Sequence, residues 1–237
     1  MRAVDRIIAI SDIHGEGRKL LALLEECEYD ANTDLLVIVG DMLDRGEENL
    51  DTLAICRKFQ RQGAILLKGN HEQFVHDSII EMLTNENWRA KPSVDLYNWY
   101  TYHGGYSTYQ EIKNLSPDRL RKILRFIRSL PFYYSAGRFI FSHAGANTAK
   151  PIEENEEDET LWMERSFPVC PAYPNKVLIF GHVPTWGLPP YNSKFKKKNA
   201  KIWYDTVHKD KIGIDCGSCF GGRLAALEIP TYREFYV

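Results

Sequence analysis

Carboxylate, imidazole and amide side chains recur in short polar motifs, most of which directly follow runs of β-branched and apolar residues. The seven motifs are Ser11-Asp12-Ile13-His14-Gly15, Gly40-Asp41-Met42-Leu43-Asp44-Arg45-Gly46, Gly69-Asn70-His71-Glu72, His103-Gly104-Gly105, Ser142-His143-Ala144-Gly145, Gly181-His182 and Asp215-Cys216-Gly217. Side chains of these types suit divalent metals of hard and borderline character. Two such metals held close together can share a water whose pKa falls towards neutrality. The motifs therefore predict a centre for two metals.

The elements that must position the first motifs alternate regularly. Three strands are predicted, over residues 6–11, 35–39 and 64–67, and apolar residues at helical spacing follow each one. Asp12, Asp41 and Asn70 stand at the ends of these strands and recur at an interval of 29 residues. A strand–helix alternation implies a parallel sheet with right-handed crossovers. The three side chains should therefore meet at the carboxyl edge of that sheet.

The rest of the chain divides into a helical middle and a strand-rich last third. Residues 76–135 are predicted to form a helical insertion, in which Ser116 and Pro117 begin a helix that Pro131 closes. Four further strands are predicted, over residues 139–141, 177–180, 212–214 and 224–229. Two sheets packed face to face between helices would accommodate both halves. We expect a single α/β domain over residues 1–237.

Composition argues against several functional classes. The 237 residues include 30 Lys and Arg against 32 Asp and Glu, so no overall field favours nucleic acid or a membrane surface. No apolar run reaches the roughly 18 residues of a membrane span, and the first strand begins too early to leave room for a signal peptide. Five cysteines without regular spacing suit a reducing compartment. We expect a soluble cytoplasmic protein, monomeric or weakly oligomeric.

The residue types at the strand ends suggest separate roles. Asp12 and His14, two residues apart, could ligate one metal, and Asp41 is a candidate carboxylate bridging both metals. The neutral oxygen and imidazole ligands that would complete a second site are Asn70, His143 and His182. The sequence therefore offers enough ligands for two metals.

Three further residues could act on a phosphoryl group held there. His71 follows a ligand directly, so its side chain should diverge from the metals yet stay near the reacting centre. An Asp–His pair can hold an imidazolium as a proton donor, and Asp44 is the candidate partner. Arg45 could bind a phosphoryl oxygen through its forked guanidinium.

In combination the motifs Asp-Ile-His-Gly, Gly-Asp-x-x-Asp-Arg-Gly, Gly-Asn-His-Glu and Ser-His-Ala-Gly resemble the signature set of the phosphoprotein phosphatase branch of the calcineurin-like metallophosphoesterases. The resemblance spans residues 11–182 and extends into 214–217 and 221–224. The compact length is similar to that of bacterial and bacteriophage serine/threonine phosphatases and of symmetrical diadenosine tetraphosphate hydrolases. The resemblance implies a four-layer αββα sandwich with a small helical cap region.

The same resemblance implies a role for each candidate residue. It implies two divalent metal ions, Mn²⁺ in the first place and Fe or Zn²⁺ as alternatives. The implied ligands are Asp12, His14 and Asp41 for the first metal, and Asp41, Asn70, His143 and His182 for the second. His71 would be the general acid, oriented by Asp44, and Arg45 a phosphate clamp. Arg165 corresponds to a second phosphate-binding arginine but stands one residue later than in the family pattern.

The implied activity is that of a serine/threonine protein phosphatase, with phosphotyrosine or small phosphomonoesters as secondary substrates. A hydroxide bridging the metals would attack phosphorus in line, without a phosphoenzyme. Hydrolysis of diadenosine tetraphosphate or another nucleotide pyrophosphate bond is an alternative, which an aromatic sandwich from Trp99, Tyr102 or Trp186 would favour. A non-catalytic phosphoprotein-binding module is a further alternative, although it would be expected to lack His71 or a metal ligand.

Three segments could border the substrate cleft. His103 lies in the aromatic-rich residues 97–106, which could form a wall facing the substrate or pack within the helical cap. The acidic residues 153–159 are predicted to be a solvated loop, and because they lie between His143 and Arg165 they could also rim the cleft and discourage acidic substrates. The basic residues 194–198 could attract polyphosphate or phosphopeptide.

Overall fold

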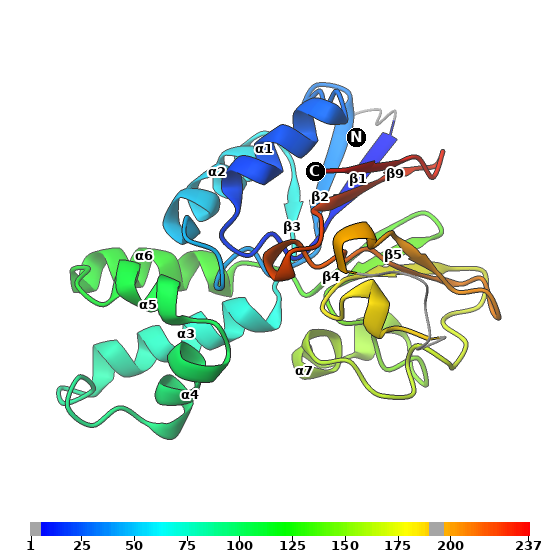
Figure 1. Ribbon diagram of the computed structural model, residues 1–237. Helices are drawn as coiled ribbons and strands as arrows, with labels where there is room; N and C mark the ends of the chain where they lie inside the picture. The colour runs from blue at the N-terminus through cyan, green and yellow to red at the C-terminus, as the bar shows by residue number, and fades with distance from the viewer. Residues whose placement is uncertain (1–5, 190–196) are drawn as a thin grey trace.

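Two mixed five-stranded sheets form the centre of the computed structural model, which describes residues 6–189 and 197–237 (Figure 1). The first sheet has the order β10-β9-β1-β2-β3. Its strands are β1 (Arg6–Ile10), β2 (Asp34–Ile38), β3 (Ile65–Leu66), β9 (Ala225–Ile229) and β10 (Glu234–Tyr236). Strands β1, β2 and β3 are parallel, as predicted, and β9 joins β1 in the antiparallel sense.

The second sheet has the order β4-β5-β6-β8-β7. Its strands are β4 (Tyr133–Ala136), β5 (Phe139–Ser142), β6 (Val177–Phe180), β7 (Trp203–Tyr204) and β8 (Lys211–Gly213). Strands β5, β6 and β8 are parallel, and the edge strands β4 and β7 run against them. The parallel strands of both sheets therefore supply several carboxyl ends near which polar side chains can gather.

Seven α-helices are present in the described residues. They are α1 (Gly17–Glu26), α2 (Asn49–Arg61), α3 (Asn70–Thr84), α4 (Val94–Tyr102), α5 (Tyr106–Ile112), α6 (Pro117–Arg128) and α7 (Glu157–Leu161). Helices α3 to α6, here called the cap, form a lobe to one side of the sheets (Figure 1). Helix α6 begins as predicted, because the Ser116 hydroxyl accepts a hydrogen bond from the Arg119 amide at 3.4 Å and Pro117 occupies the first turn. Among the described helices none has the length and apolarity that crossing a membrane requires.

The faces of the two sheets that meet are apolar. Successive strand residues point to opposite faces, so Ala9 of β1 faces the second sheet while Ile8 and Ile10 face the helices. The main side chains between the sheets are Val37, Val39, Leu67, Phe139, Phe141, Val177, Ile179, Ile212, Ile214 and Leu227. This interior confirms the predicted α/β class with two sheets packed face to face.

The two outer faces are covered differently. Buried residues of α1, α2 and the cap pack on the first sheet, as the helical periodicity of that half predicts. The second sheet is covered mainly by loops and by the short 3₁₀-helix η1 (Ile152–Glu154). Their contacts with Ile140, Leu178 and Phe180 complete the fourth layer. That layer is therefore less helical than the first.

The acidic side chains of residues 153–159 are mostly exposed, as predicted, but the prediction that the segment is a loop was wrong. Part of the segment is η1 and part is α7, which begins with a capping box in which the Glu159 carboxylate accepts a hydrogen bond from the Glu156 amide at 2.7 Å. Glu157 pairs with Lys68, and Glu159 pairs with Lys150 at 2.7 Å. These two ion pairs balance part of the negative charge of the segment. Of the basic residues 194–198, the first three lie outside the described residues, and Lys197 begins η3 (Lys197–Asn199).

Candidate metal centre and active site

The turns after β1, β2 and β3 bring three of the predicted ligands to one edge of the first sheet. Asp12, Asp41 and Asn70 are all buried, and the Asp12 amide donates to the carbonyl of Gly40 at 3.2 Å, which ties the first turn to the second. Parallel pairing of the three strands is the cause, because it aligns their carboxyl ends.

Several candidate residues have a left-handed backbone, which side chains other than glycine rarely adopt. They are Asp12, His14, Asp41, Asp44, Arg45 and His182, with φ between 47° and 73°. Each such conformation costs on the order of 1–3 kcal/mol and persists only where the surroundings enforce it. The strain is thus concentrated in the turns that carry the polar side chains.

Glu72 holds one of these turns in place. One of its oxygens accepts hydrogen bonds from the amides of Asp41 and Gly69, each at 2.9 Å, and the other accepts from Met42 at 2.9 Å and Leu43 at 3.2 Å. Four backbone donors on one buried carboxylate fix the turn after β2 against the start of α3. The sequence contains a signal for this, since an acidic residue at the third position of a helix is typical of a capping box, but the role across the sheet was missed.

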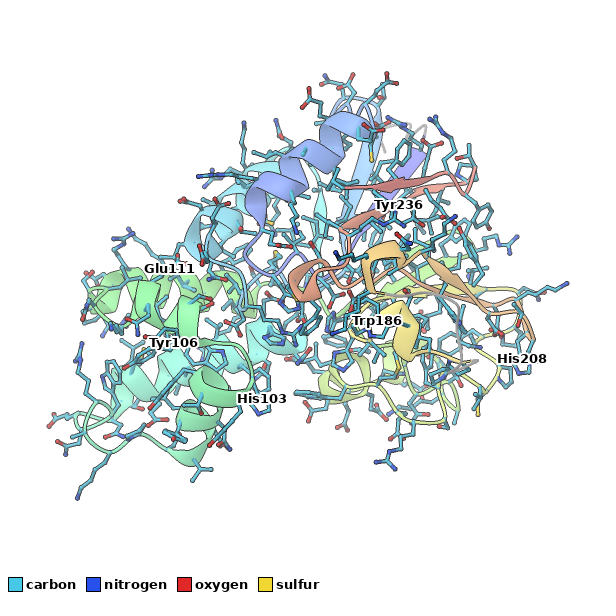
Figure 2. All side chains as sticks on the ribbon, in the orientation of Figure 1. His103, Tyr106, Glu111, Trp186, His208 and Tyr236 are labelled. Carbon is cyan, nitrogen blue, oxygen red and sulfur yellow. The ribbon has the colours of Figure 1, made fainter. Side chains whose placement is uncertain are left out.

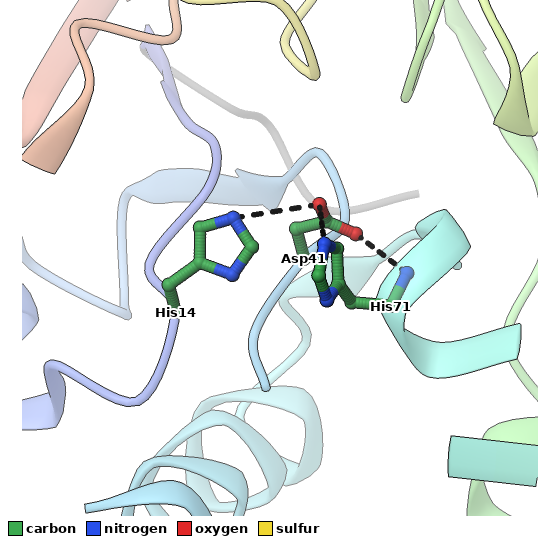
Figure 3. Close-up of side chains that lie close together, drawn as sticks. All are labelled: His14, Asp41 and His71. Atoms are coloured by element: carbon green, nitrogen blue, oxygen red, sulfur yellow. Dashed lines mark hydrogen bonds and ion pairs between the residues drawn. The ribbon is translucent and has the colours of Figure 1, made fainter. Parts of the chain in front are cut away.

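A first group of ligand atoms lies around His14 (Figure 3). Its Nε2 is 3.5 Å from Asp41 Oδ2, the contact drawn in Figure 3. The same nitrogen is 3.7 Å from Asp12 Oδ1. The Nδ1 of His14 lies 2.8 Å from the carbonyl oxygen of Leu43, so Nδ1 carries the proton and the Nε2 lone pair faces the carboxylates. Asp12 Oδ1 is buried and has no hydrogen-bond partner among the described residues. An unpartnered carboxylate oxygen beside a lone pair is a position that suits a cation.

A second group lies around His143 of the second sheet. Its Nε2 is 2.9 Å from Asn70 Oδ1, 3.2 Å from His182 Nδ1 and 3.4 Å from Asp41 Oδ1. The Nδ1 of His143 donates to the carbonyl of Val39 at 3.0 Å, which again leaves the Nε2 lone pair facing inward. Lone pairs thus converge from both sheets on one point.

Burial controls the charge of these groups. It lowers the pKa of His14 and His143, and it lowers that of His182 to about 2, so the rings are neutral and able to ligate. Burial, reinforced by the nearby Asp12 carboxylate, raises the pKa of Asp41 and of Asp215 well above the usual range. A bound cation would offset the electrostatic repulsion between these neighbouring carboxylates.

Asp41 belongs to both groups. Its Oδ2 faces His14 at 3.5 Å, and its Oδ1 faces His143 at 3.4 Å. A carboxylate with one oxygen in each group is the arrangement that a pair of neighbouring metals requires. The donor set and the unpartnered oxygen of Asp12 fit two divalent metals, although a third ring, that of His71, also lies within reach of the first group.

His71 is held by Asp44. The Nδ1 of His71 is 2.8 Å from Asp44 Oδ2, and Trp99 of α4 donates its indole N–H to the same oxygen at 2.7 Å. Burial raises the pKa of Asp44 to about 7 and lowers the pKa of His71 well below its usual value. The role of Trp99 was missed, because nothing in the sequence joins an indole in the cap to a turn 55 residues earlier.

Arg45 extends across the site between the two imidazoles. Its guanidinium donates to Nε2 of His14 at 2.8 Å and to Nε2 of His71 at 3.0 Å, and it lies over the ring of Phe220. The Arg45 amide donates to the carbonyl of Gly104 at 2.8 Å. A β-carbon at Gly104 would lie 2.7 Å from the Arg45 side chain, so the Gly-Gly motif of the cap holds this arginine.

The other predicted substrate-binding residues lie farther out. His103 is exposed on the cap (Figure 2). Its ring stacks on Phe74 with ring centres 4.9 Å apart, and Phe74 in turn meets His71 edge to face at 5.6 Å. Arg165 is exposed and forms no hydrogen bond or ion pair with the residues that the structure describes. The structure therefore brings Arg45 into the site and places His103 behind the ring of Phe74, which separates it from His71. The role of Arg165 stays a prediction.

The aromatic residues considered for an adenine sandwich do not share one environment. Trp99 is buried and donates to Asp44, so its ring is not available to such a sandwich. Tyr102 is 73% exposed and contacts Tyr97. Trp186 packs against the core between the sheets (Figure 2). A different ring, Trp162, is 43% exposed and meets His182 edge to face at 5.8 Å.

Known bacterial enzymes are similar to this chain in sequence. The serine/threonine-protein phosphatase 1 of Salmonella typhimurium is 42% identical over 69 residues, which are 29% of this chain and only 31% of that protein. The serine/threonine-protein phosphatase 2 of the same organism is 26% identical over 235 residues, covering 94% of this chain and 92% of that protein. The asymmetrical bis(5'-nucleosyl)-tetraphosphatase PrpE of Bacillus velezensis is 25% identical, covering 96% and 90%.

The fold has close counterparts among solved structures. The crystal structure of a putative diadenosine tetraphosphatase superposes with a TM-score of 0.66 at 20% identity, covering 98% of this chain and 92% of that one. Residues 5–209 match the calcineurin-like phosphoesterase family. With two groups of metal-ligand atoms joined by one carboxylate at the edge of its parallel strands, this chain belongs to the calcineurin-like phosphoesterases.

Proposed function

We propose that the protein is a metal-dependent serine/threonine protein phosphatase that acts in the cytoplasm. The observation that carries the proposal is the position of Asp41, with one carboxylate oxygen towards His14 and the other towards His143. The relationship to serine/threonine-protein phosphatase 2 over most of both chains supports the substrate class.

Two divalent metals, for which we propose Mn²⁺, would neutralise phosphoryl charge and activate a water when bound here. The ligands would be Asp12, His14 and Asp41 on one side, and Asp41, Asn70, His143 and His182 on the other. Once His71 is protonated, which the Asp44 carboxylate would favour, its Nε2 would donate the added proton to the departing alkoxide, since Nδ1 is engaged by Asp44 at 2.8 Å. Arg45, 3.0 Å from that same Nε2, would bind a phosphoryl oxygen through its forked N–H groups.

A peptide substrate is supported by the charge around the site. Asp77, Glu81 and Asp95 line a cavity beside Phe74 on the cap. These carboxylates would repel a polyphosphate chain but accept the uncharged or basic flanks of a phosphopeptide.

Hydrolysis of a dinucleoside tetraphosphate is the second candidate. The exposed ring of Trp162 beside His182 favours it, because an exposed aromatic face next to the ligands could stack a nucleobase. The names of the Bacillus velezensis relative and of the solved structure support the same candidate. Both candidates use the same ligands.

The test is phosphate release by Mn²⁺-reconstituted protein from a phosphoserine or phosphothreonine peptide and from diadenosine tetraphosphate at matched concentrations. We expect a higher kcat/KM on the peptide. A higher kcat/KM on the dinucleotide would overturn the protein phosphatase proposal. Protein treated with a chelator should lose activity on both substrates and regain it when Mn²⁺ is added.

A further inference from the structure

A cavity of about 280 Å³ lies in the cap between α3 and α4. It is lined by side chains of α3, of α4 and of the residues next to α4. The lining residues are Phe74, Asp77, Ser78, Glu81, Ser93, Asp95, Leu96, Asn98, Trp99 and His103. Pockets for drug-sized ligands enclose roughly 300–1,000 Å³. This cavity is therefore sized for one side chain or small group and not for a dinucleotide.

Its lining is acidic. Asp77, Glu81 and Asp95 supply three carboxylates, and none of the described residues that line the cavity is a lysine or arginine. The carboxylate of Asp77 accepts hydrogen bonds from Gln73 and His76, and that of Glu81 accepts one from the Ser93 amide. These partners leave the negative charge in place. The cavity thus favours a cationic occupant.

A serine at a largely buried position also lines the cavity. Ser78 is only 4% exposed, and its side chain forms no hydrogen bond with any residue that the structure describes. It lies on the same helical face as Phe74, Asp77 and Glu81, all of which line the cavity, so its hydroxyl is directed into that space. Polar atoms at largely buried positions usually have a hydrogen-bond partner, from protein or from ordered water. An ammonium or guanidinium N–H in the cavity would supply one.

The cavity adjoins the reacting centre. Phe74 lines it and also meets His71 at 5.6 Å. Trp99 lines it and donates to Asp44, the partner of His71. The rise of an α-helix, about 1.5 Å per residue, puts Ser78 about 10 Å along α3 from His71. An extended peptide advances about 3.3 Å per residue and would cover that distance in about three residues.

We propose that this cavity binds the side chain of an arginine or lysine two or three residues from the phosphorylated residue of a peptide substrate. The inference rests on the proposed protein phosphatase function and adds a preference for basic phosphopeptides. The carboxylates would attract the cation, Ser78 would accept a hydrogen bond from it, and the Trp99 ring would line the floor beneath it.

The test is a set of phosphoserine peptides with an alanine background, in which a single arginine occupies each position from three residues before to three residues after the phosphoserine. With the Mn²⁺-reconstituted protein, we expect arginine at one position two or three residues away to raise kcat/KM about tenfold over the all-alanine peptide, mainly through KM. Glutamate at that position should lower kcat/KM below that of the alanine peptide, a comparison that requires no protein variant.

Variants localise the effect. In the double variant Asp77→Asn with Asp95→Asn, the ratio of kcat/KM between the arginine and alanine peptides should fall to about one. Asp118→Asn is the matched control, because Asp118 is an exposed carboxylate of the cap that pairs with Arg121 and does not line the cavity. This control should keep the tenfold ratio.

The outcomes separate the two proposals. Hydrolysis of the peptides with equal kcat/KM at every arginine position would overturn the inference and leave the phosphatase function standing. An arginine preference that survives the double substitution would also overturn it, because another surface would then bind the cation. Failure to hydrolyse any of the phosphopeptides would overturn both.

Discussion

The Nδ1 of His71 lies 2.8 Å from the Oδ2 of Asp44, and both side chains are almost fully buried. Trp99 donates to the same oxygen, so the carboxylate is fixed from two sides. The His71 ring is thereby oriented with Nε2 towards Asp41, 3.9 Å from its nearer oxygen. This geometry allows His71 either to donate a proton to a leaving group or to ligate a metal.

His71→Asn distinguishes the two roles. If His71 is the general acid, the variant should retain both metals and lose about 10²–10⁴ in kcat on phosphoserine, with a smaller loss on an aryl phosphate whose leaving group needs no proton. Metal analysis and kinetics on the two substrates check this. Equal losses on both substrates, or loss of a metal, would contradict the role. Asp44→Asn should show the same pattern in weaker form, and the double variant should be little worse than His71→Asn.

Asp41→Asn should remove metal binding and activity together. The amide keeps one oxygen but replaces the other by a donor, so it cannot face both His14 and His143 with lone pairs. Metal content after dialysis and kcat on an aryl phosphate measure the effect, and we expect both to fall to background. A variant that held two metals at the full rate would show that Asp41 does not bridge them.

Gly181→Ala should displace Asp12. A β-carbon at Gly181 would lie 2.1 Å from Asp12 Oδ2 and 2.0 Å from the Ser11 hydroxyl, in a region with no room to yield. We expect weakened metal binding together with a destabilisation of about 1–3 kcal/mol. Gly187→Ala is the control, because the nearest contact of its β-carbon is Val183 at 3.1 Å. Metal titration and thermal unfolding of both variants measure these effects. Equal metal affinity and equal stability of the two variants would refute the prediction.

Arg6→Gln should destabilise the protein in a pH-dependent way. Arg6 lies 3.0 Å from Asp34 and 2.7 Å from Glu228. Burial alone would raise the pKa of both carboxyls, but the hydrogen bonds that they accept, including those from Arg6, outweigh burial and hold both pKa values below their usual range. We expect a loss of about 3 kcal/mol in the free energy of unfolding at pH 7.

The sign of the pH effect follows from the lowered pKa values. Folding releases protons from the two carboxyls, so their contribution is fully present above the unfolded pKa values of about 4 and is lost as pH falls through the folded ones. The difference between wild type and Arg6→Gln should therefore shrink below about pH 4. Urea denaturation at pH 7 and pH 3 measures it. Arg18→Gln, which breaks an exposed pair with Glu48, should cost less than about 1 kcal/mol at either pH.

Much of the site could be predicted because its residues follow the strands directly. The interval between Asp12, Asp41 and Asn70 is one strand–helix unit, and parallel pairing then places the three together. The second half of the site was less constrained by spacing. His143 and His182 come from the other sheet, and only the family motifs linked them to the first half before their atoms were seen to converge.

Features that depend on tertiary contacts could not be predicted. Strands β4, β7 and β10 are edge strands that are too short to show a recognisable alternation of apolar and polar residues in the sequence. Helix α7 is acidic, and part of its charge is balanced by two lysines that lie outside the helix, Lys68 and Lys150. The role of Glu72 depends on amides about 30 residues away, for which a local pattern carries no information.

The pairing of β1 with β9 has a consequence for biosynthesis. The strand that leads into Asp12 leaves the ribosome first, but its partner, which includes Glu228, is made 222 residues after Arg6. Until then one edge of β1 is open and available for pairing with other chains. During most of translation the first half of the metal centre therefore stands on an incomplete sheet. We expect the folding of the newly synthesised chain to depend on chaperones for this reason.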